Sequence, residues 1–316
     1  MTNKRILIIG GTGALGKTLI KRYYDKNELI IFSRDEHKHY YLLKDYPKLR
    51  SVIGDIRDAQ SIMHALHTYK PQVVINAAAL KHVPICQENP YESIKTNIIG
   101  HQHVIDCIRT VDNVEALIFV STDKACKPIN VYGMCKALAE ELYIKYANSQ
   151  SKTKVVLVRY GNVLESTGSV IPLFKNILKT GAKVLPITHS DMTRFLLTLE
   201  DATSLIENAY NSTDSHGKIA IPKVKSLKIT DVARALIKEY GTPDVQLVEV
   251  GIRPGEKLHE EMISSEEWAR STEYDKFFLI GTKVISSEIK SYNSFDSLMA
   301  PEDAHAFLKL SGVFHD

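Results

Sequence analysis

The residues best suited to acid–base chemistry lie between positions 121 and 136. Ser121-Thr122-Asp123-Lys124 follows an apolar run, and Tyr132 and Lys136 come shortly afterwards. Tyr132 and Lys136 are four residues apart, so on a helix their side chains share one face. A lysine beside a phenol favours the phenolate form. We therefore expect Tyr132 to accept a proton from a hydroxyl group.

The Tyr-x3-Lys spacing alone is a weak signal, because it occurs three times in this chain, beginning at Tyr40, Tyr91 and Tyr132. Only the third occurrence lies on an expected helix just after a strand that ends in Ser121-Thr122. We therefore place the chemistry at Tyr132 and expect the other two tyrosines to take no part in it.

A glycine-rich loop, Gly10-Gly-Thr-Gly-Ala-Leu-Gly-Lys-Thr18, follows the first expected strand and opens a helix. It fits both the phosphate loop of NTPases and the loop of dinucleotide-binding enzymes. Both loops bring backbone amides against phosphate at a helix N-terminus. On the dinucleotide interpretation, the contacts come from Gly10, Thr12, Gly13, Ala14, Leu15 and Gly16.

The ends of the later strands favour the dinucleotide interpretation. An NTPase needs an aspartate after a later apolar strand to help hold magnesium, but Val73-Val-Ile-Asn76 ends in asparagine. An acidic residue after the second strand selects NAD, whereas this strand ends in Ser33-Arg34, which suits a ribose 2′-phosphate. We therefore expect NADP as the cofactor. Further contacts are expected from Asp35, Lys38, Asp55, Ile56, Ala77 and Ala78.

Strand and helix patterns alternate over the first 160 residues, which predicts an α/β fold with a doubly wound parallel Rossmann sheet. The ligand crevice of such a sheet lies at the carboxyl ends of its strands. Strands are expected at 5–9, 29–32, 51–53, 73–76, 116–121 and 155–159. Helices are expected at 16–24, 59–67, 92–109 and 131–148.

The pattern loosens after Arg159, and we expect a smaller C-terminal substrate-binding lobe there. Its expected helices are 169–180, 230–240 and 301–310, with loops at 183–188 and 251–257. The predicted NADP-binding Rossmann domain is 1–165, with about 190–222 returning to it. The predicted substrate-binding lobe comprises 166–189 and 223–316.

Composition is that of an ordinary globular protein, with 316 residues, 44% hydrophobic residues, 24% charged residues and a mean hydropathy of −0.13. A net charge of +3 is too small to indicate nucleic-acid binding. The longest apolar runs are strand-sized, so no membrane span is expected, and we expect a cytoplasmic protein. The four cysteines form no CxxC pair, and no metal site is expected.

Together, these motifs resemble those of the inverting UDP-N-acetylglucosamine 4,6-dehydratases, which are extended short-chain dehydrogenases. The resemblance runs from about residue 5 to 280. Besides the glycine loop and Ser121–Lys124, it rests on 33–36, 54–55, 77–84, 95–97, 159–163, 192–195 and 253–257. Asp123-Lys124 carries the most weight, because dehydratases that retain the C5 configuration resemble this family but have Asp-Glu there.

The resemblance implies a role for each catalytic residue. Tyr132 would take the 4-hydroxyl proton while hydride passes from C4 to NADP+, with Lys136 on the cofactor ribose and Thr122 on the 4-oxygen. Lys124 would remove the C5 hydrogen, and Asp123 would protonate the departing C6 hydroxyl. Hydride return to C6 and protonation of C5 from the opposite face would give an inverted 4-keto-6-deoxy sugar.

The resemblance also implies the partners of the chain. The nucleotide-sugar pocket would be lined by Lys81, Asn162, Thr188, Arg194, Arg253 and Glu256, where arginines suit a diphosphate. A homo-oligomer, either a dimer or a hexamer, would form by packing of helices such as 92–109 and 131–148. Thr167 and Lys127 depart from the family pattern, which leaves the exact sugar open.

Other functions remain open at this point. A nucleotide-sugar 4-epimerase of the same fold would need Tyr132 and Lys136 but no acid–base pair for C5 and C6. A P-loop ATPase or kinase would use the glycine loop and leave Tyr132 idle. A regulator that binds the cofactor without catalysis would not need the complete catalytic set that is present.

Overall fold

A computed structural model describes residues 1–149, 152–164 and 168–314. Its centre is a nine-stranded sheet in the order β14-β15-β10-β6-β5-β4-β1-β2-β3. The seven strands from β10 to β3 run parallel. They are β1 (Arg5–Ile9), β2 (Glu28–Ser33), β3 (Arg50–Ile53), β4 (Val73–Asn76), β5 (Ala116–Val120), β6 (Lys154–Val158) and β10 (Ile219–Pro222). The predicted Rossmann sheet is confirmed.

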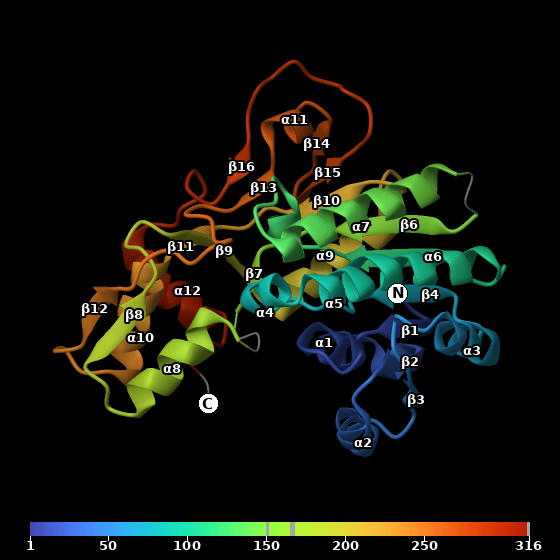
Figure 1. The fold of residues 1–316 in the computed structure, drawn as a ribbon, viewed down its shortest axis with the longest axis horizontal. Coiled ribbons are helices and arrows are strands. Elements are labelled where there is room, and N and C mark those ends of the chain that lie inside the picture. Colours follow the sequence, from blue (N-terminus) through green and yellow to red (C-terminus); the bar gives the residue numbers. More distant parts are fainter. Residues whose placement is uncertain (150–151, 165–167, 315–316) are drawn as a thin grey trace.

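Helices cover both faces of this sheet (Figure 1). One face carries α3 (Ala59–Tyr69), α6 (Gly100–Arg109) and α7 (Val131–Asn148). The other carries α1 (Ala14–Tyr23), α2 (Glu36–Asp45) and α9 (Leu199–Asn211). The central strands are buried on both sides, which explains their continuous β-branched and aliphatic sequences.

Local sequence signals fix where the helices that border the site begin. Asn130 precedes α7 and accepts a hydrogen bond from the backbone N–H of Gly133, 2.8 Å away. Asp35 caps α2 in the same way by accepting from the backbone N–H of Lys38. The predicted helix 92–109 is instead composed of α5 (Pro90–Ile94), a π-helical turn (Lys95–Ile99) and α6, following the short α4 (Val83–Glu88).

The C-terminal half builds a lobe with its own apolar core beside the carboxyl ends of the strands (Figure 1). Its helices are α8 (Val170–Lys179), α10 (Ile229–Tyr240) and α12 (Ala304–Leu310), the last preceded by a 3-10 turn (Pro301–Asp303). The expected loop at 183–188 contains β8 (Val184–Ile187), which pairs in parallel with β12 (Gln246–Glu249). That loop prediction was wrong, because strand pairing overrides the local Gly/Pro signal.

Small strands connect the lobe to the main sheet. A three-stranded sheet joins β7 (Asn162–Val163), β9 (Thr193–Leu197) and β11 (Ser226–Lys228), and β13 (Glu261–Ile263) pairs with β16 (Tyr292–Asn293). After the short α11 (Ser265–Trp268), β14 (Ser271–Glu273) and β15 (Phe277–Ile280) join the main sheet antiparallel. Residues 271–280 were expected in the lobe. These edge strands pair antiparallel, so they lack the alternation of strand and helix from which the parallel strands were predicted.

Candidate active site

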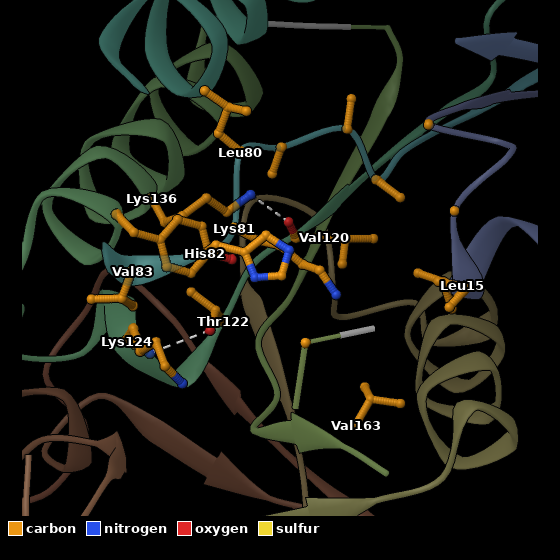
Figure 2. A pocket seen from close by; sticks show the side chains of 18 of the residues that line it. Leu15, Leu80, Lys81, His82, Val83, Val120, Thr122, Lys124, Lys136 and Val163 are labelled. Atoms are coloured by element: carbon orange, nitrogen blue, oxygen red, sulfur yellow. Dashed lines mark hydrogen bonds between the residues drawn. The ribbon is translucent and has the colours of Figure 1, made fainter. Parts of the chain in front are cut away.

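One cavity of about 960 Å³ opens at the carboxyl ends of the parallel strands and extends to the lobe (Figure 2). This is where an open α/β sheet binds its ligands. Every site residue predicted from the sequence lines this cavity except Asp123. Asp123 is fully buried just behind the wall. The fold therefore brings together around one cavity the predicted site residues, which are spread from Gly10 to Glu256 in the sequence.

The glycine loop forms a phosphate-sized cradle at the start of α1. Gly13 caps this helix without any side-chain hydrogen bond. Gly10 has φ +83°, and a Cβ there would lie 2.9 Å from the backbone nitrogen of Ala78. A Cβ on Gly16 would collide with the carbonyl of Gly11. The backbone fits a dinucleotide pyrophosphate, because Gly10, Gly13 and Gly16, which carry no side chains, line the cavity at the N-terminus of α1.

The end of β2 presents a hydroxyl and a guanidinium to the cavity. Ser33 Oγ lies 2.9 Å from Thr12 Oγ1 and 2.7 Å from His39 Nε2, which fixes its position. Arg34 is more than half exposed, with its nearest anion, Asp55, at 3.8 Å. Lys38 pairs with Asp35 at 2.8 Å. Arg34 is thus the freer of the two predicted cations to bind a phosphate.

Two residues that support this end of the cavity were not predicted from the sequence. His39 is buried between Ser33 and Ser51, and burial lowers its pKa, so it is neutral at pH 7. Arg57 hydrogen-bonds Asp55 and, against the effect of burial, lowers the pKa of that carboxyl group. The remaining predicted residues here, Ile56, Ala77 and Ala78, line the same wall.

Asn97 holds the segment that follows β4. Its side-chain amide donates to the carbonyl of Leu80 at 2.8 Å and its side-chain oxygen accepts from the N–H of Leu80 at 2.9 Å. This fixes the neighbouring Lys81 at the cavity wall, where burial lowers the pKa of its amine. Asn97 thus positions the loop that follows β4 through its two hydrogen bonds to the backbone of Leu80.

Tyr132 and Lys136 are both buried on α7. Lys136 Nζ donates to the carbonyl of Val120 at 2.6 Å and lies 4.0 Å from the centre of the Phe119 ring. Burial lowers the pKa of Lys136 to about 7, against the opposing effect of Glu140. Burial and the charge of Asp123 raise the pKa of Tyr132.

The expected phenolate at Tyr132 is therefore wrong for the ligand-free protein. Lys136 carries only part of a charge at pH 7, and its amine is directed at a carbonyl. A cation beside the ring, such as an oxidised nicotinamide, would restore the preference for phenolate.

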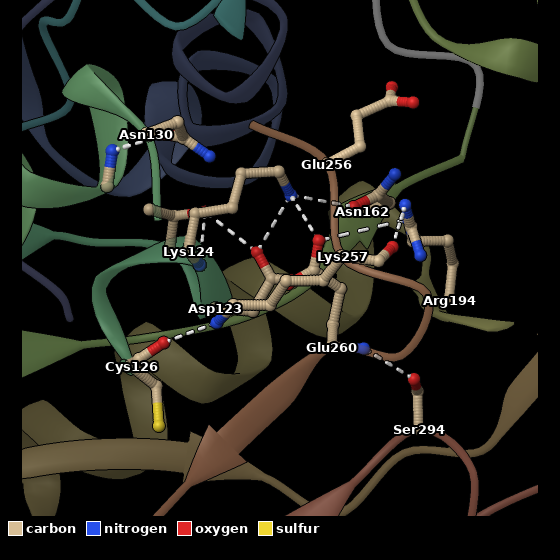
Figure 3. A network of polar contacts seen from close by, with 12 residues as sticks. Asp123, Lys124, Cys126, Asn130, Asn162, Arg194, Glu256, Lys257, Glu260 and Ser294 are labelled. Carbon is tan, nitrogen blue, oxygen red and sulfur yellow. Dashed lines mark hydrogen bonds and ion pairs between the residues drawn. The ribbon is translucent and has the colours of Figure 1, made fainter. Parts of the chain in front are cut away.

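Asp123 and Lys124 lie on a 3-10 turn directly after β5 (Figure 3). Lys124 Nζ is 3.0 Å from Asp123 Oδ1 and 3.2 Å from Asn162 Oδ1. Thr122 Oγ1 also donates to Asp123 Oδ1, at 2.9 Å. The side chain of Asp123 does not line the cavity. It is hydrogen-bonded to Thr122 and Lys124, which both line it.

To act as a base at neutral pH, Lys124 would need a pKa lowered by burial and by nearby cations such as Lys136 and an oxidised nicotinamide. The structure contradicts this for the ligand-free site. Burial lowers the pKa of Lys124, but the carboxylates of Asp123 and Glu260 outweigh burial and raise it overall. Glu260 comes from a segment 136 residues further along the chain, at 3.8 Å from Nζ. No local pattern could have predicted this neighbour.

A buried ion cluster supports the turn from behind. Ser121 Oγ donates to Glu140 at 2.5 Å, and the guanidinium of Arg159 contacts both Glu140 and Glu267 at 2.6–2.8 Å. Breaking such a pair by removing one partner typically costs about 3–5 kcal/mol. This cluster joins the ends of β5 and β6 to α7 and α11, and its acidic members were not predicted from the sequence.

The lobe contributes the remaining predicted residues. Thr188 follows β8 and lines the cavity with Asn162. Arg194 is buried and donates to the carbonyls of Thr193 and Lys257 at 2.7 and 2.9 Å, so part of its donor set is already used. Arg253 is exposed and pairs with Glu256. It remains the most accessible cation of this group for a diphosphate.

The two departures from the family pattern have different outcomes. Lys127 pairs with Glu261 at 3.2 Å and does not line the cavity. Thr167 lies outside the described residues. Within the described ranges, no group of His, Cys, Asp or Glu has a metal-binding arrangement. No helix there is long and apolar enough to cross a membrane.

Comparisons with known proteins agree with this geometry. The sequence profile of the family described as "Polysaccharide biosynthesis protein" matches residues 6–282. An inverting UDP-N-acetylglucosamine 4,6-dehydratase of Campylobacter jejuni subsp. jejuni serotype O:2 is 43% identical, covering 89% of this chain and 84% of that protein. A UDP-glucose 4-epimerase of Rickettsia felis is 38% identical, covering 93% and 92%. The X-ray structure of Pen from Bacillus thuringiensis superposes with a TM-score of 0.91 at 31% identity, covering 99% of both chains.

Proposed function

This chain belongs to the polysaccharide biosynthesis protein family, and on that premise we propose that it is a UDP-N-acetylglucosamine 4,6-dehydratase that inverts C5. The observation that carries the proposal is the hydrogen-bonded pair Asp123–Lys124 at the same cavity as Tyr132. Removing water from C5 and C6 of a sugar needs one base and one acid held close together. A hydroxyl-to-ketone oxidation alone would need only Tyr132 and Lys136.

The side chains divide the first step between them. The glycine loop and the end of β2 would hold a nicotinamide cofactor, which would supply the acceptor for hydride from C4 and the source of hydride for C6. Tyr132 takes the proton of the 4-hydroxyl. Thr122, which lines the cavity beside Tyr132, donates to the 4-oxygen. Lys136, whose Nζ donates to the carbonyl of Val120, would hold the cofactor ribose.

Elimination uses the proton that Asp123 and Lys124 share. Transfer of this proton from Lys124 to Asp123 across their 3.0 Å contact leaves an amine and a carboxylic acid without changing the net charge. The amine then takes the C5 proton. The acid releases its proton, through the hydroxyl of Thr122, to the departing C6 hydroxyl, which leaves as water. The pair is thereby returned to its ionic form.

We further propose NADP as the cofactor and a nucleotide sugar as the substrate. Ser33 and Arg34 line the cavity at the end of β2, where Arg34 lies 3.8 Å from the carboxylate of Asp55 and Asp35 is paired with Lys38. Arg253, Arg194 and Lys81 line the cavity and give it a positive charge that suits a diphosphate. The expected homo-oligomer, cytoplasmic location and division into cofactor and substrate domains stay predictions.

The direct test is incubation with UDP-N-acetylglucosamine in heavy water, followed by NMR. We expect a 4-keto-6-deoxy sugar with deuterium at C5, inverted C5 configuration and the substrate's C4 hydrogen at C6. The competing function is 4-epimerisation, which the similarity to the Rickettsia felis protein supports. It predicts a C4 epimer that keeps its 6-hydroxyl and carries no deuterium. A product with retained C5 configuration would contradict the inverting assignment.

Cofactor choice gives a second test. Arg34→Ala should reduce the preference for NADP+ over NAD+ by about 10-fold or more, because a guanidinium–phosphate contact is worth about 1.5–3 kcal/mol. Dissociation constants for both cofactors, measured by calorimetry, check this. The matched control is Arg50→Ala, an exposed arginine on β3 outside the cavity, which should change neither constant. Equal affinity of the unmodified protein for both cofactors would refute the NADP assignment.

A further inference from the structure

A second buried carboxylate stands beside Lys124, and the reaction proposed above gives it no role. Glu260 precedes β13, and its side chain is only 4% exposed. Its Oε1 lies 3.8 Å from Lys124 Nζ and 3.9 Å from Arg194 Nε. Figure 3 shows its side chain directed at both cations. Since Glu260 lines the cavity, it stands where a bound sugar would lie.

The backbone of Glu260 is held on both sides. Its N–H donates to Ser294 Oγ at 2.8 Å, and its carbonyl accepts from the N–H of Ser294 at 2.8 Å. Ser294 is fully buried and its hydroxyl also contacts Thr193 Oγ1 at 2.6 Å. These bonds join three distant segments, so the position of the carboxylate is set before any ligand enters.

The other oxygen of this carboxylate is unsatisfied. Oε2 of Glu260 is buried and has no hydrogen-bond partner within the described part of the chain. Leaving a buried charged acceptor without a donor is costly. Glu260 lines the cavity, so a rotation of its carboxylate would bring this oxygen within reach of an O–H or N–H group of a ligand. A sugar carries several such groups.

Lys124 lies in a cluster of charged side chains in which the numbers of negative and positive groups are equal. In the described residues, the charged groups that face it are Asp123 on its own turn, Glu260 before β13 and Arg194 on β9. Two carboxylates therefore surround two cations. Each carboxylate favours the ammonium form of Lys124, whereas the base of the elimination has to be the amine.

We propose that Glu260 is a positioning residue that holds Lys124 beside Asp123 and that its free oxygen accepts a hydrogen bond from a hydroxyl or amide N–H of the bound sugar. This inference rests on the proposed function, since it assigns Lys124 as the base. A hydrogen bond donated to Oε2 of Glu260 draws negative charge away from Oε1. The attraction between Oε1 and the ammonium group of Lys124 is then weaker. Sugar binding thereby makes Lys124 easier to deprotonate, and the base becomes active when the substrate is in place.

The test uses Glu260→Gln, which removes the charge and keeps the shape. One unit charge at 3.8 Å changes a pKa by about one unit or more. The pH of half-maximal kcat on the acid side should therefore move down by about one unit, because the Asp123–Lys124 pair, without this neighbouring negative charge, takes up an extra proton only at lower pH. Glu260→Asp keeps the charge, so its pH profile should stay near that of the unmodified enzyme while its KM rises.

The sugar contact has its own measurement. Glu260→Ala should weaken binding of UDP-N-acetylglucosamine by about 10-fold and leave the binding of UDP unchanged, because only the sugar supplies the donor. Calorimetry measures both. This comparison does not require turnover. If the unmodified protein binds the nucleotide sugar but forms no keto sugar, the proposed function fails while the Glu260 contact is still tested.

The matched control is Glu261→Gln, the adjacent carboxylate, which pairs with Lys127 outside the cavity and should change none of these readouts. A Glu260→Gln enzyme with a lower melting temperature but an unmoved pH profile would overturn the positioning role. Equal losses for UDP and for the nucleotide sugar would overturn the sugar contact. If Glu260→Gln does not fold, the unchanged charge in Glu260→Asp still tests the proposal through its pH profile and KM.

Discussion

Replacing Lys124 with alanine is expected to lower the rate of 4-keto-6-deoxy sugar formation by about 10³-fold, the middle of the range for loss of a general acid–base group. Lys124 is the amine nearest to Asp123, and none of the other cavity lysines, Lys38, Lys81 and Lys136, is hydrogen-bonded to that carboxylate. The first hydride transfer does not need Lys124. Slow growth of the reduced-nicotinamide absorbance should therefore remain when UDP-N-acetylglucosamine is added to the NADP+-loaded variant.

Two further measurements make this prediction specific. Deuterium exchange at C5 should stop in Lys124→Ala, because this variant lacks the amine that we assign as the base. Lys127→Ala is the matched control, since Lys127 lies three residues further on, is about half exposed and pairs with Glu261. It should keep its rate within about twofold. C5 exchange at the normal rate in Lys124→Ala would show that another group is the base.

Replacing Tyr132 with phenylalanine is expected to lower turnover by about 10²-fold or more, because the proton acceptor of the first step is lost while the ring remains. Unlike Lys124→Ala, this variant should show no reduced-nicotinamide absorbance, since C4 oxidation itself is blocked. The ring is 8% exposed and packed at the start of α7, so the fold should survive. Single-turnover absorbance with the NADP+-loaded protein separates the two variants.

The other two Tyr-x3-Lys pairs provide matched controls. Tyr40 and Tyr91 are exposed, and Lys44 and Lys95 lie over their rings at 4.5 and 4.3 Å. Neither tyrosine lines the cavity. Tyr40→Phe and Tyr91→Phe should leave turnover nearly unchanged. A large loss in either control with an active Tyr132→Phe would move the active site elsewhere.

The pH dependence of Tyr132 follows from its surroundings. Burial raises the pKa of this phenol in the ligand-free protein. A raised pKa means that the phenolate forms only at high pH unless a cation is brought to the ring. Binding of the oxidised cofactor should therefore shift the acid limb of the reaction to lower pH, whereas the reduced form should not. The oxidised cofactor should thus lower the pKa of Tyr132, whereas the reduced cofactor should not.

The amino-acid sequence by itself predicted the parallel sheet and the place of the cavity. Continuous apolar runs separated by amphipathic helices permit few arrangements, and parallel strands all end at the same edge. The glycine loop, Ser33-Arg34 and Ser121–Lys124 each follow directly after a strand, so their meeting at one cavity follows from topology. Tyr132 could be chosen from three candidates for the same reason.

Only the tertiary structure decided the protonation of the site. The pKa of Lys124 is raised because Asp123 on its own turn and Glu260, which folding brings to 3.8 Å from Nζ, outweigh both burial and the opposing charge of Arg194. Lys136 loses part of its charge because the sheet, α7 and the Phe119 ring bury it. Asp123 is hidden behind Thr122 and Lys124, although its neighbours in the sequence are exposed to the cavity. Strand and helix periodicity are local properties of the chain, whereas a pKa depends on burial and on charges that folding brings from more than 100 residues away.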